Sequence, residues 1–233
     1  MITHPFPLLQ PFRDQLDVRL LTKEENLSSD DDIASLASAQ NLASLHQVHG
    51  NRAVVVRSET RRIEQADALA TDQIGLTLTI RFADCQNFIV FSPEKKVIGL
   101  IHAGWKGLKS GVISSTFSLF KKEWNIDPAT TIVCAGPSLC MRCAEFTDPL
   151  CEAPELKNYV KNRCIDLQKA ADEELFSLGV LEKNFKRLSD CTRCHPETYV
   201  TYRGGDREGV ERGRSNCLMV KLCAENQELG SKN

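Results

Sequence analysis

Alternation between apolar and polar side chains marks the central part of this chain. Leu76 to Phe82 reads Leu-Thr-Leu-Thr-Ile-Arg-Phe, which is the period-two pattern of a half-buried strand. Ala53 to Arg57 is a β-branched run typical of a buried strand. Phe88 to Ser92 and Val97 to His102 also have strand character and are separated by a short polar segment, so we expect them to form a hairpin.

Helical spacing replaces this alternation after Gly104. One apolar face runs from there to Trp124 and contains Leu108, Val112, Ile113, Phe117 and Phe120. We expect another helix from Ile33 to Leu45, starting near Ser29, whereas the rest of the first forty residues are weakly patterned. Of two candidate helices between Pro149 and Gly179, the stronger is Asp166 to Leu178, with Gly179 placed to cap it.

The remaining apolar segments predict the last strands: Thr131 to Ala135, Leu188, Tyr199 to Tyr202 and Cys217 to Leu222. Strands and helices are mixed without regular alternation, which predicts an α+β fold rather than a doubly wound one. No repeat, linker or low-complexity block divides the chain. We therefore expect a single domain over residues 1–233, with mixed β-sheets flanked by helices and the functional site at strand ends.

Charge and composition narrow the class of partner. The chain has 29 Lys and Arg against 31 Asp and Glu, a net charge of -2, so it lacks the excess of positive charge that is typical of nucleic-acid-binding proteins. Its apolar runs are shorter than the roughly 20 residues that span a bilayer, and the N-terminus has no signal-peptide pattern. We expect a cytoplasmic monomer that binds neither nucleic acid nor a membrane, with its ten cysteines mostly reduced.

Three short stretches contain the candidate chemistry, each where a regular element meets a turn: Leu45 to Gly50, Phe82 to Gln86 and Ile101 to Gly107. They contribute His49, Cys85 and His102. Two imidazoles and one thiolate suit zinc and leave its fourth position open for water or substrate. Asp84 is the nearest candidate for proton transfer or for orienting a ligand histidine, and His46 is assigned a structural role or one in support of the ligand residues.

The same residues also support a metal-free reaction. In that interpretation Cys85 is the nucleophile, His102 is the base and Asp84 orients the base. Spacing along the chain does not separate the two mechanisms.

Two Cys-x-x-Cys pairs offer a second metal site. Cys140 and Cys143 could share a structural zinc with Cys191 and Cys194, although 47 residues separate the pairs.

A late cluster of arginines lies among glycines, at Arg203, Arg207, Arg212 and Arg214. A planar guanidinium matches phosphate oxygens, and glycine permits close backbone approach, so this segment is a candidate site for phosphate or another small anion. Arg203 and Arg214 are the preferred contacts.

Several of these motifs together resemble the laccase-domain or multicopper polyphenol oxidase family, also called the peptidoglycan editing factor or purine nucleoside phosphorylase family. The similar stretches run in the family's order from about residue 45 to residue 222. They are Gln47-Val48-His49-Gly50, Ala66-Asp67-Ala68-Leu69-Ala70-Thr71, Ala83-Asp84-Cys85, His102-Ala103-Gly104-Trp105-Lys106-Gly107, Gly136-Pro137-Ser138, Cys191-Thr192, Tyr202-Arg203 and Gly213-Arg214.

The resemblance implies a single α+β domain with zinc held by His49, Cys85 and His102. It implies phosphorolysis of purine nucleosides such as adenosine, inosine and methylthioadenosine, with accompanying adenosine deaminase activity. The chain departs from the family in a short region before His49 and in Lys106, where arginine is usual.

Three other functions stay open beside phosphorolysis. One is a zinc amide hydrolase that edits a peptidoglycan precursor, and another is a weakened member that binds metal and nucleotide without turnover. Copper polyphenol oxidation fits less well, because one site of two histidines and one cysteine cannot build a trinuclear copper cluster.

Overall fold

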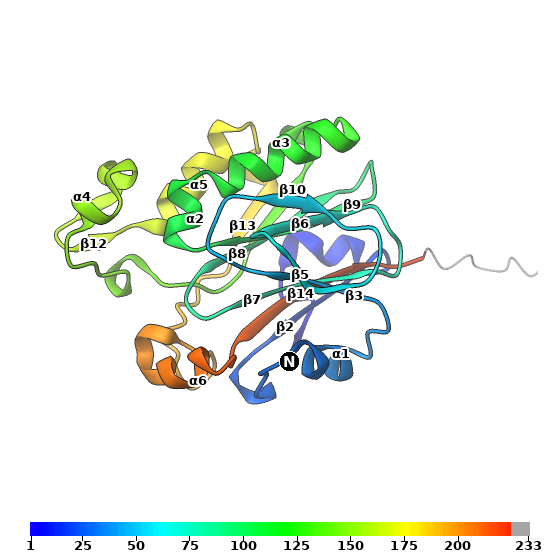
Figure 1. The fold of residues 1–233 in the computed structure, drawn as a ribbon. Helices are drawn as coiled ribbons and strands as arrows, with labels where there is room; N and C mark the ends of the chain where they lie inside the picture. Colours follow the sequence, from blue (N-terminus) through cyan, green and yellow to red (C-terminus); the bar gives the residue numbers. More distant parts are fainter. Residues whose placement is uncertain (225–233) are drawn as a thin grey trace, which may run out of the picture.

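Two six-stranded sheets lie face to face in the computed structural model, which describes residues 1–224 (Figure 1). The first sheet has the order β1 (Ile2–Thr3), β2 (Leu16–Leu21), β14 (Asn216–Leu222), β7 (Thr77–Phe82), β3 (Leu42–His46) and β5 (Thr60–Gln65). The second has the order β13 (Phe185–Arg187), β10 (Ile132–Ala135), β8 (Gln86–Ser92), β9 (Val97–Ala103), β6 (Ala68–Thr71) and β4 (Ala53–Val55). Parallel and antiparallel pairs occur in both sheets, which confirms the predicted mixed α+β fold.

Helices cover the outer faces of the two sheets (Figure 1). On the second sheet lie α2 (Trp105–Lys109), α3 (Val112–Trp124) and α5 (Leu167–Ser177), and on the first lies α1 (Asp30–Ala37). Apolar side chains fill each interface, so the molecule has a central core between the sheets and an outer core beneath each helical layer. The burial of this apolar surface is the main force that holds the layers together.

Short elements complete the described chain. They are the helices α4 (Pro149–Glu152) and α6 (Arg207–Glu211), the strands β11 (Val160–Lys161) and β12 (Cys164–Ile165), the π-helical turn η7 (Tyr202–Asp206), and the 3-10 helices η1 (Pro7–Phe12), η2 (Lys23–Glu25), η3 (Pro128–Thr130), η4 (Met141–Cys143), η5 (Pro154–Tyr159) and η6 (Glu182–Asn184). No helix within residues 1–224 is both long and apolar enough to cross a membrane.

Most of the elements predicted from the pattern are present. The alternating segment is β7, and β8 and β9 form the predicted hairpin, in register from Gln86 opposite Ala103 to Ser92 opposite Val97. Strand β14 and helix α5 also match their predictions, and Gly179 follows α5 with a φ of 105°, a conformation that glycine adopts without strain.

Several predictions of local structure were wrong. The helix expected to run to Leu45 ends at Ala37, and Leu42–His46 is strand β3, which lies between β5 and β7. The apolar helical face predicted from Gly104 to Trp124 belongs to two helices, α2 and α3. They are separated at Gly111, whose φ of 82° is not a helical conformation. Tyr199 to Tyr202 is not a strand, because side-chain atoms of Asn216 bind the backbone of Val200 in place of a neighbouring strand.

Strand β2, Leu16–Leu21, lies in the weakly patterned N-terminal region and was not predicted. Leu188 lies directly after β13, Phe185–Arg187, and not within a strand.

Candidate active site

His49, Cys85 and His102 converge where the two sheets meet. Their candidate ligand atoms all lie within 4.8 Å of one another, and the two imidazole rings are in edge contact with centroids 4.9 Å apart. His102 is on β9 of the second sheet, and His49 follows β3 of the first. Cys85 lies in the short connection that carries the chain from β7 of the first sheet to β8 of the second. The stacking of the two sheets therefore builds the cluster.

A buried carboxylate, Asp67, holds both histidines. Its Oδ1 lies 2.9 Å from His102 Nδ1 and accepts a hydrogen bond of 2.9 Å from the backbone N–H of His49. Its Oδ2 accepts from the N–H of Gly50 at 2.7 Å and of Val48 at 3.2 Å. These bonds support the left-handed backbone conformation of His49, whose φ is 59°. Because Asp67 contacts Nδ1 of His102, Nε2 is the ring nitrogen of His102 that could bind a metal ion.

Sequence reasoning did not assign a role to Asp67. The available signal was an acidic residue directly before Ala68–Thr71, a strand of buried, uncharged residues. A carboxylate at such a position is buried only when it has partners.

Asp84, which was expected to handle a proton, lies beside Cys85 at the cavity wall and is 7% exposed. Its Oδ1 accepts hydrogen bonds from the hydroxyls of Thr192 at 2.6 Å and Thr201 at 2.7 Å. Its Oδ2 accepts from the backbone N–H of Arg203 at 2.7 Å. The carboxylate therefore joins three segments of chain, and the carboxylate that contacts His102 is Asp67.

The electrostatics of the cluster favour a thiolate. Burial by itself would raise the pKa of Cys85, but the adjacent His102 and hydrogen bonds from His102 and His49 lower it to about 6. Burial opposes the charged form of His102, yet Cys85 and the hydrogen bond to Asp67 raise its pKa to about 9. Asp67 is buried, which would raise its pKa, but His102 and the surrounding N–H donors hold it below the usual range. The thiolate is the form of cysteine that binds metals and attacks electrophiles.

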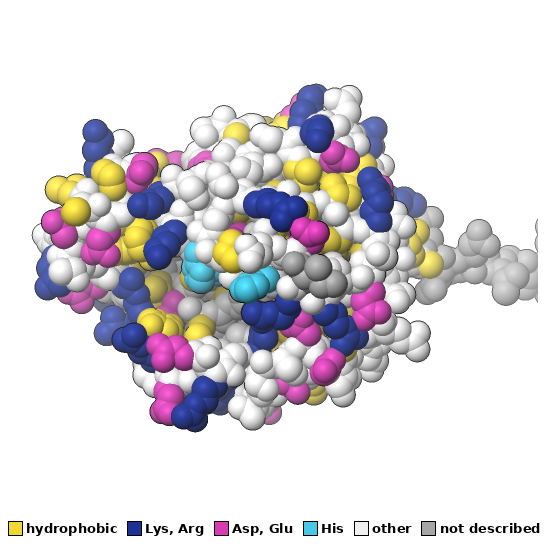
Figure 2. All heavy atoms as spheres, viewed as in Figure 1, with side chains coloured by type: hydrophobic (Ala, Val, Ile, Leu, Met, Phe, Trp, Pro, Cys, Tyr) yellow, Lys and Arg dark blue, Asp and Glu magenta, His cyan; other side chains and the backbone are white. Residues whose placement is uncertain are grey.

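A cavity of about 550 Å³ opens over this cluster, within the size range of small-molecule sites. Apolar side chains such as Leu45, Phe82 and Trp105 form part of its wall. Four arginines also line it: Arg62, Arg81, Arg203 and Arg214. In Figure 2, histidine side chains reach the surface near the middle of the face, with basic side chains around them. The cavity thus combines a polar floor, apolar walls and positive charge.

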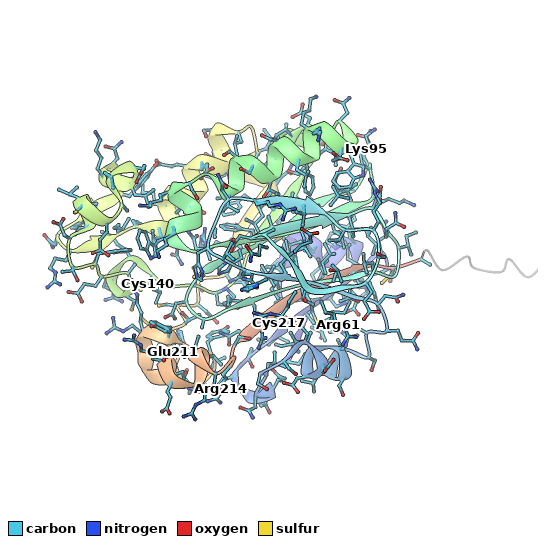
Figure 3. All side chains as sticks on the ribbon, viewed as in Figure 1. Arg61, Lys95, Cys140, Glu211, Arg214 and Cys217 are labelled. Carbon is cyan, nitrogen blue, oxygen red and sulfur yellow. The ribbon has the colours of Figure 1, made fainter. Side chains whose placement is uncertain are left out.

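The two arginines predicted to contact an anion differ in their surroundings. Arg203 stacks over Phe146, and its guanidinium donates to the backbone carbonyl of Glu145. Arg214 lies 3.9 Å from the carboxylate of Asp206, while its Nε is buried and has no hydrogen-bond partner among the described residues. Figure 3 labels Arg214 beside α6. Arg214 therefore has one donor that no described residue satisfies, and its side chain lines the cavity.

Arg81 and Arg62 were not predicted as lining residues. Arg81 is held by Ser215 at 2.8 Å and by the carbonyl of Gly213, and its side chain is 11% exposed. Its position near the end of β7, just before Asp84 and Cys85, was the signal in the sequence. His46, by contrast, is exposed and does not line the cavity.

Two groups of donors among the described residues could hold a metal ion. One is His49, Cys85 and His102, whose two nitrogens and one sulfur match a catalytic zinc site with an open position. The other consists of the thiols of Cys140, Cys143, Cys191 and Cys194. The donor chemistry therefore fits zinc at the predicted His2Cys position.

The fold and this site together define a class of protein: two stacked mixed sheets with a His2Cys cluster at their junction. The chain belongs to the family described as multi-copper polyphenol oxidoreductase laccase, whose sequence model matches residues 22–221. It is 32% identical over 161 residues to human Purine nucleoside phosphorylase LACC1, a match that covers 63% of this chain and 37% of the human protein. The chain thus spans well under half the length of that relative.

A bacterial relative matches over more of its length. Purine nucleoside phosphorylase CA_C1699 of Clostridium acetobutylicum is 26% identical over 216 residues, which cover 88% of this chain and 87% of the relative. The crystal structure of YlmD from Geobacillus stearothermophilus has the same fold, with a TM-score of 0.78, 19% identity and 94% coverage of both chains. The structural likeness shows that the two chains share a fold.

Proposed function

We propose that this protein is a zinc-dependent purine nucleoside phosphorylase. The observation that carries the proposal is one cavity of about 550 Å³ that contains both the His49, Cys85 and His102 cluster and four arginines. Phosphorolysis needs a site for a purine nucleoside, a site for phosphate next to it, and a group that stabilises charge on the leaving base. The relatives named as purine nucleoside phosphorylases support the same reaction class.

In this reaction a phosphate oxygen forms a bond to ribose C1′ as the bond between C1′ and the purine nitrogen breaks. The leaving purine takes up a proton, and the products are the free base and ribose 1-phosphate. Zinc bound by His49, Cys85 and His102 would act as a Lewis acid on an electronegative atom of the substrate. Asp67 would keep His102 in the tautomer that presents Nε2.

The arginines supply the phosphate site in this proposal. Arg214 would donate from its unpartnered Nε, and Arg203 would add positive charge from the adjacent wall. We assign Asp84 a positioning role, because its oxygens already accept from Thr192, Thr201 and the backbone of Arg203. That arrangement fixes the chain segment from which Arg203 enters the cavity.

Gln86 is a candidate contact for the purine. Its Nε2 donates to the carbonyl of Leu167 at 2.7 Å, which fixes the orientation of the amide. The side-chain oxygen, Oε1, is buried and has no hydrogen-bond partner in the described part of the chain, although Gln86 lines the cavity. A purine N–H group would satisfy this acceptor, which is costly to leave unpaired.

The direct test is release of base from adenosine, inosine and methylthioadenosine by zinc-loaded protein, with and without phosphate. We expect release that depends on phosphate and that is abolished in Cys85→Ala. Cys223→Ala is the matched control, because Cys223 lies outside the cluster and the cavity lining. The proposal fails if folded, zinc-loaded wild-type protein releases no base from any of the three nucleosides.

Arginine variants test the phosphate site separately. Arg214→Gln should raise the KM for phosphate roughly 10- to 100-fold, the cost of one lost charge-assisted hydrogen bond, while the KM for adenosine changes little. Arg212→Gln is the control, since its exposed side chain pairs with Glu208 on the surface. Equal phosphate KM values in Arg214→Gln and wild type would remove Arg214 from the site.

Two further measurements separate the other reactions that this cavity could support. Ammonia release from adenosine reports deamination, and amide cleavage of muramoyl-amino-acid substrates reports hydrolysis of a peptidoglycan precursor. Metal and purine binding without any turnover would instead identify a binding protein.

A further inference from the structure

Four cysteine thiols gather outside the cavity, from two loops that are 47 residues apart in the sequence. Cys140 directly precedes η4, and Cys143 is its last residue, whereas Cys191 and Cys194 lie in the loop after β13. Their sulfur atoms all lie within 4.8 Å of one another, and Cys143 Sγ is 3.6 Å from Cys194 Sγ. Figure 3 labels Cys140 at the same end of the molecule as Arg214.

Both loops turn in the same way. The N–H of Cys143 donates to the carbonyl of Cys140 at 2.9 Å, and the N–H of Cys194 donates to the carbonyl of Cys191 at 3.1 Å. Each turn brings the two sulfur atoms of its Cys-x-x-Cys pair close together. The backbone N–H of Cys140 also donates to Cys191 Sγ at 3.2 Å, a hydrogen bond that stabilises a thiolate.

We infer that Cys140, Cys143, Cys191 and Cys194 bind a structural zinc ion, in addition to the metal proposed for the His2Cys cluster. Tetrahedral coordination with Zn–S bonds of about 2.3 Å places sulfurs about 3.8 Å apart, close to the observed separation of Cys143 and Cys194. All four positions are filled by protein, as in structural rather than catalytic zinc sites. The third residue of each Cys-x-x-Cys pair is arginine, Arg142 and Arg193.

This zinc would connect the two loops that support one wall of the cavity. Thr192, next to Cys191, donates to Asp84, and the carbonyl of Glu145, two residues after Cys143, accepts from Arg203. Direct backbone hydrogen bonds between the loops are few and long, such as Thr192 N–H to Ser138 O at 3.3 Å. Four Zn–S bonds would therefore add a strong link between the loops that make contacts with Asp84 and Arg203.

Metal content of the full chain, purified under reducing conditions, tests the inference directly. We expect two zinc ions per wild-type chain, one in the Cys143→Ser and Cys194→Ser double variant, and one in His49→Ala. Cys151→Ser is the matched control, because Cys151 is an exposed cysteine on the nearby helix α4, outside both clusters, and should keep two. One zinc in wild type that is lost entirely in His49→Ala would overturn the inference.

Cobalt substitution of the wild-type chain gives a second readout that needs no variant. Four thiolate ligands should give strong thiolate-to-cobalt absorption that remains in His49→Ala, where the other site is broken. A Cys143–Cys194 disulfide found by mass spectrometry in the freshly purified, folded chain would contradict zinc binding. A further expectation rests on the proposed function: loss of this zinc should raise the KM for phosphate through Arg203. Metal stoichiometry tests the site even if the chain is not a phosphorylase.

Discussion

Asp67 Oδ1 lies 2.9 Å from His102 Nδ1, and both side chains are buried. The same carboxylate accepts the backbone N–H groups of His49 and Gly50, so one side chain sets the ring orientation of one histidine and the loop conformation of the other. A carboxylate behind a ligand histidine is the usual outer support of a metal site. The relationship makes Asp67 the residue on which the geometry of the His2Cys cluster most depends.

Asp67→Asn tests this support. The amide retains one acceptor oxygen, but its NH2 group would face an N–H donor of the loop. We expect zinc affinity at the His2Cys site to fall roughly 10- to 100-fold, measured by competition with a chromogenic chelator. Asp72→Asn is the matched control, because Asp72 accepts from Trp124 at 2.9 Å and lies in neither metal cluster. Equal affinities in the two variants would show that Asp67 does not support the site.

Gly104→Ala should disrupt the cluster without changing a ligand. A Cβ at this position would lie 2.6 Å from Cδ2 of His49 and 3.1 Å from Sγ of Cys85, closer than packed atoms approach. We expect loss of metal from the His2Cys site, measured by elemental analysis. Gly50→Ala is the control, since its Cβ would meet its neighbours at an ordinary 3.6 Å. Full metal content in Gly104→Ala would mean that the loops adapt to the added carbon.

Removal of metal should expose a reactive thiol. After treatment with a strong chelator, we expect iodoacetamide to modify Cys85 before Cys134 and Cys217, because burial raises the pKa of both of those thiols to about 12. Peptide mass spectrometry over time measures the order of modification. Added zinc should protect Cys85. The same modification rate with and without zinc would argue against Cys85 as a ligand.

Asp32 predicts a dependence of stability on pH at the start of α1. Hydrogen bonds from the backbone and hydroxyl of Ser28 and from Ser29 lower its pKa from 3.8 to about 2. A depressed pKa in the folded state stabilises the protein above the unfolded pKa, and this contribution disappears as pH falls from about 4 to about 2. Asp32→Asn should therefore lower the free energy of unfolding by about 1 kcal/mol at pH 7.

Urea unfolding of wild type and Asp32→Asn across this pH range measures the difference. The gap between the two proteins should narrow below pH about 4. A gap that is constant down to pH about 2 would contradict the assigned role of the carboxylate.

Local patterns were reliable where one element had a continuous apolar face. The alternation in β7 and the helical spacing in α3 and α5 are consequences of side-chain periodicity and could be found without tertiary information. Leu42–His46 could not, because its apolar residues fit a helix equally well until β5 and β7 are placed beside them. In such short segments tertiary pairing decides the secondary structure.

The sequence by itself determined the fold class and the residue types of the candidate site. His49, Cys85 and His102 stand out because metal-binding side chains lie where predicted elements meet turns. Only the tertiary structure decided that Asp67 contacts His102, that Arg81 lines the cavity and that two loops 47 residues apart bring four thiols together. The physical reason is range: periodicity depends on neighbours along the chain, whereas these contacts depend on how two sheets and their connecting loops pack.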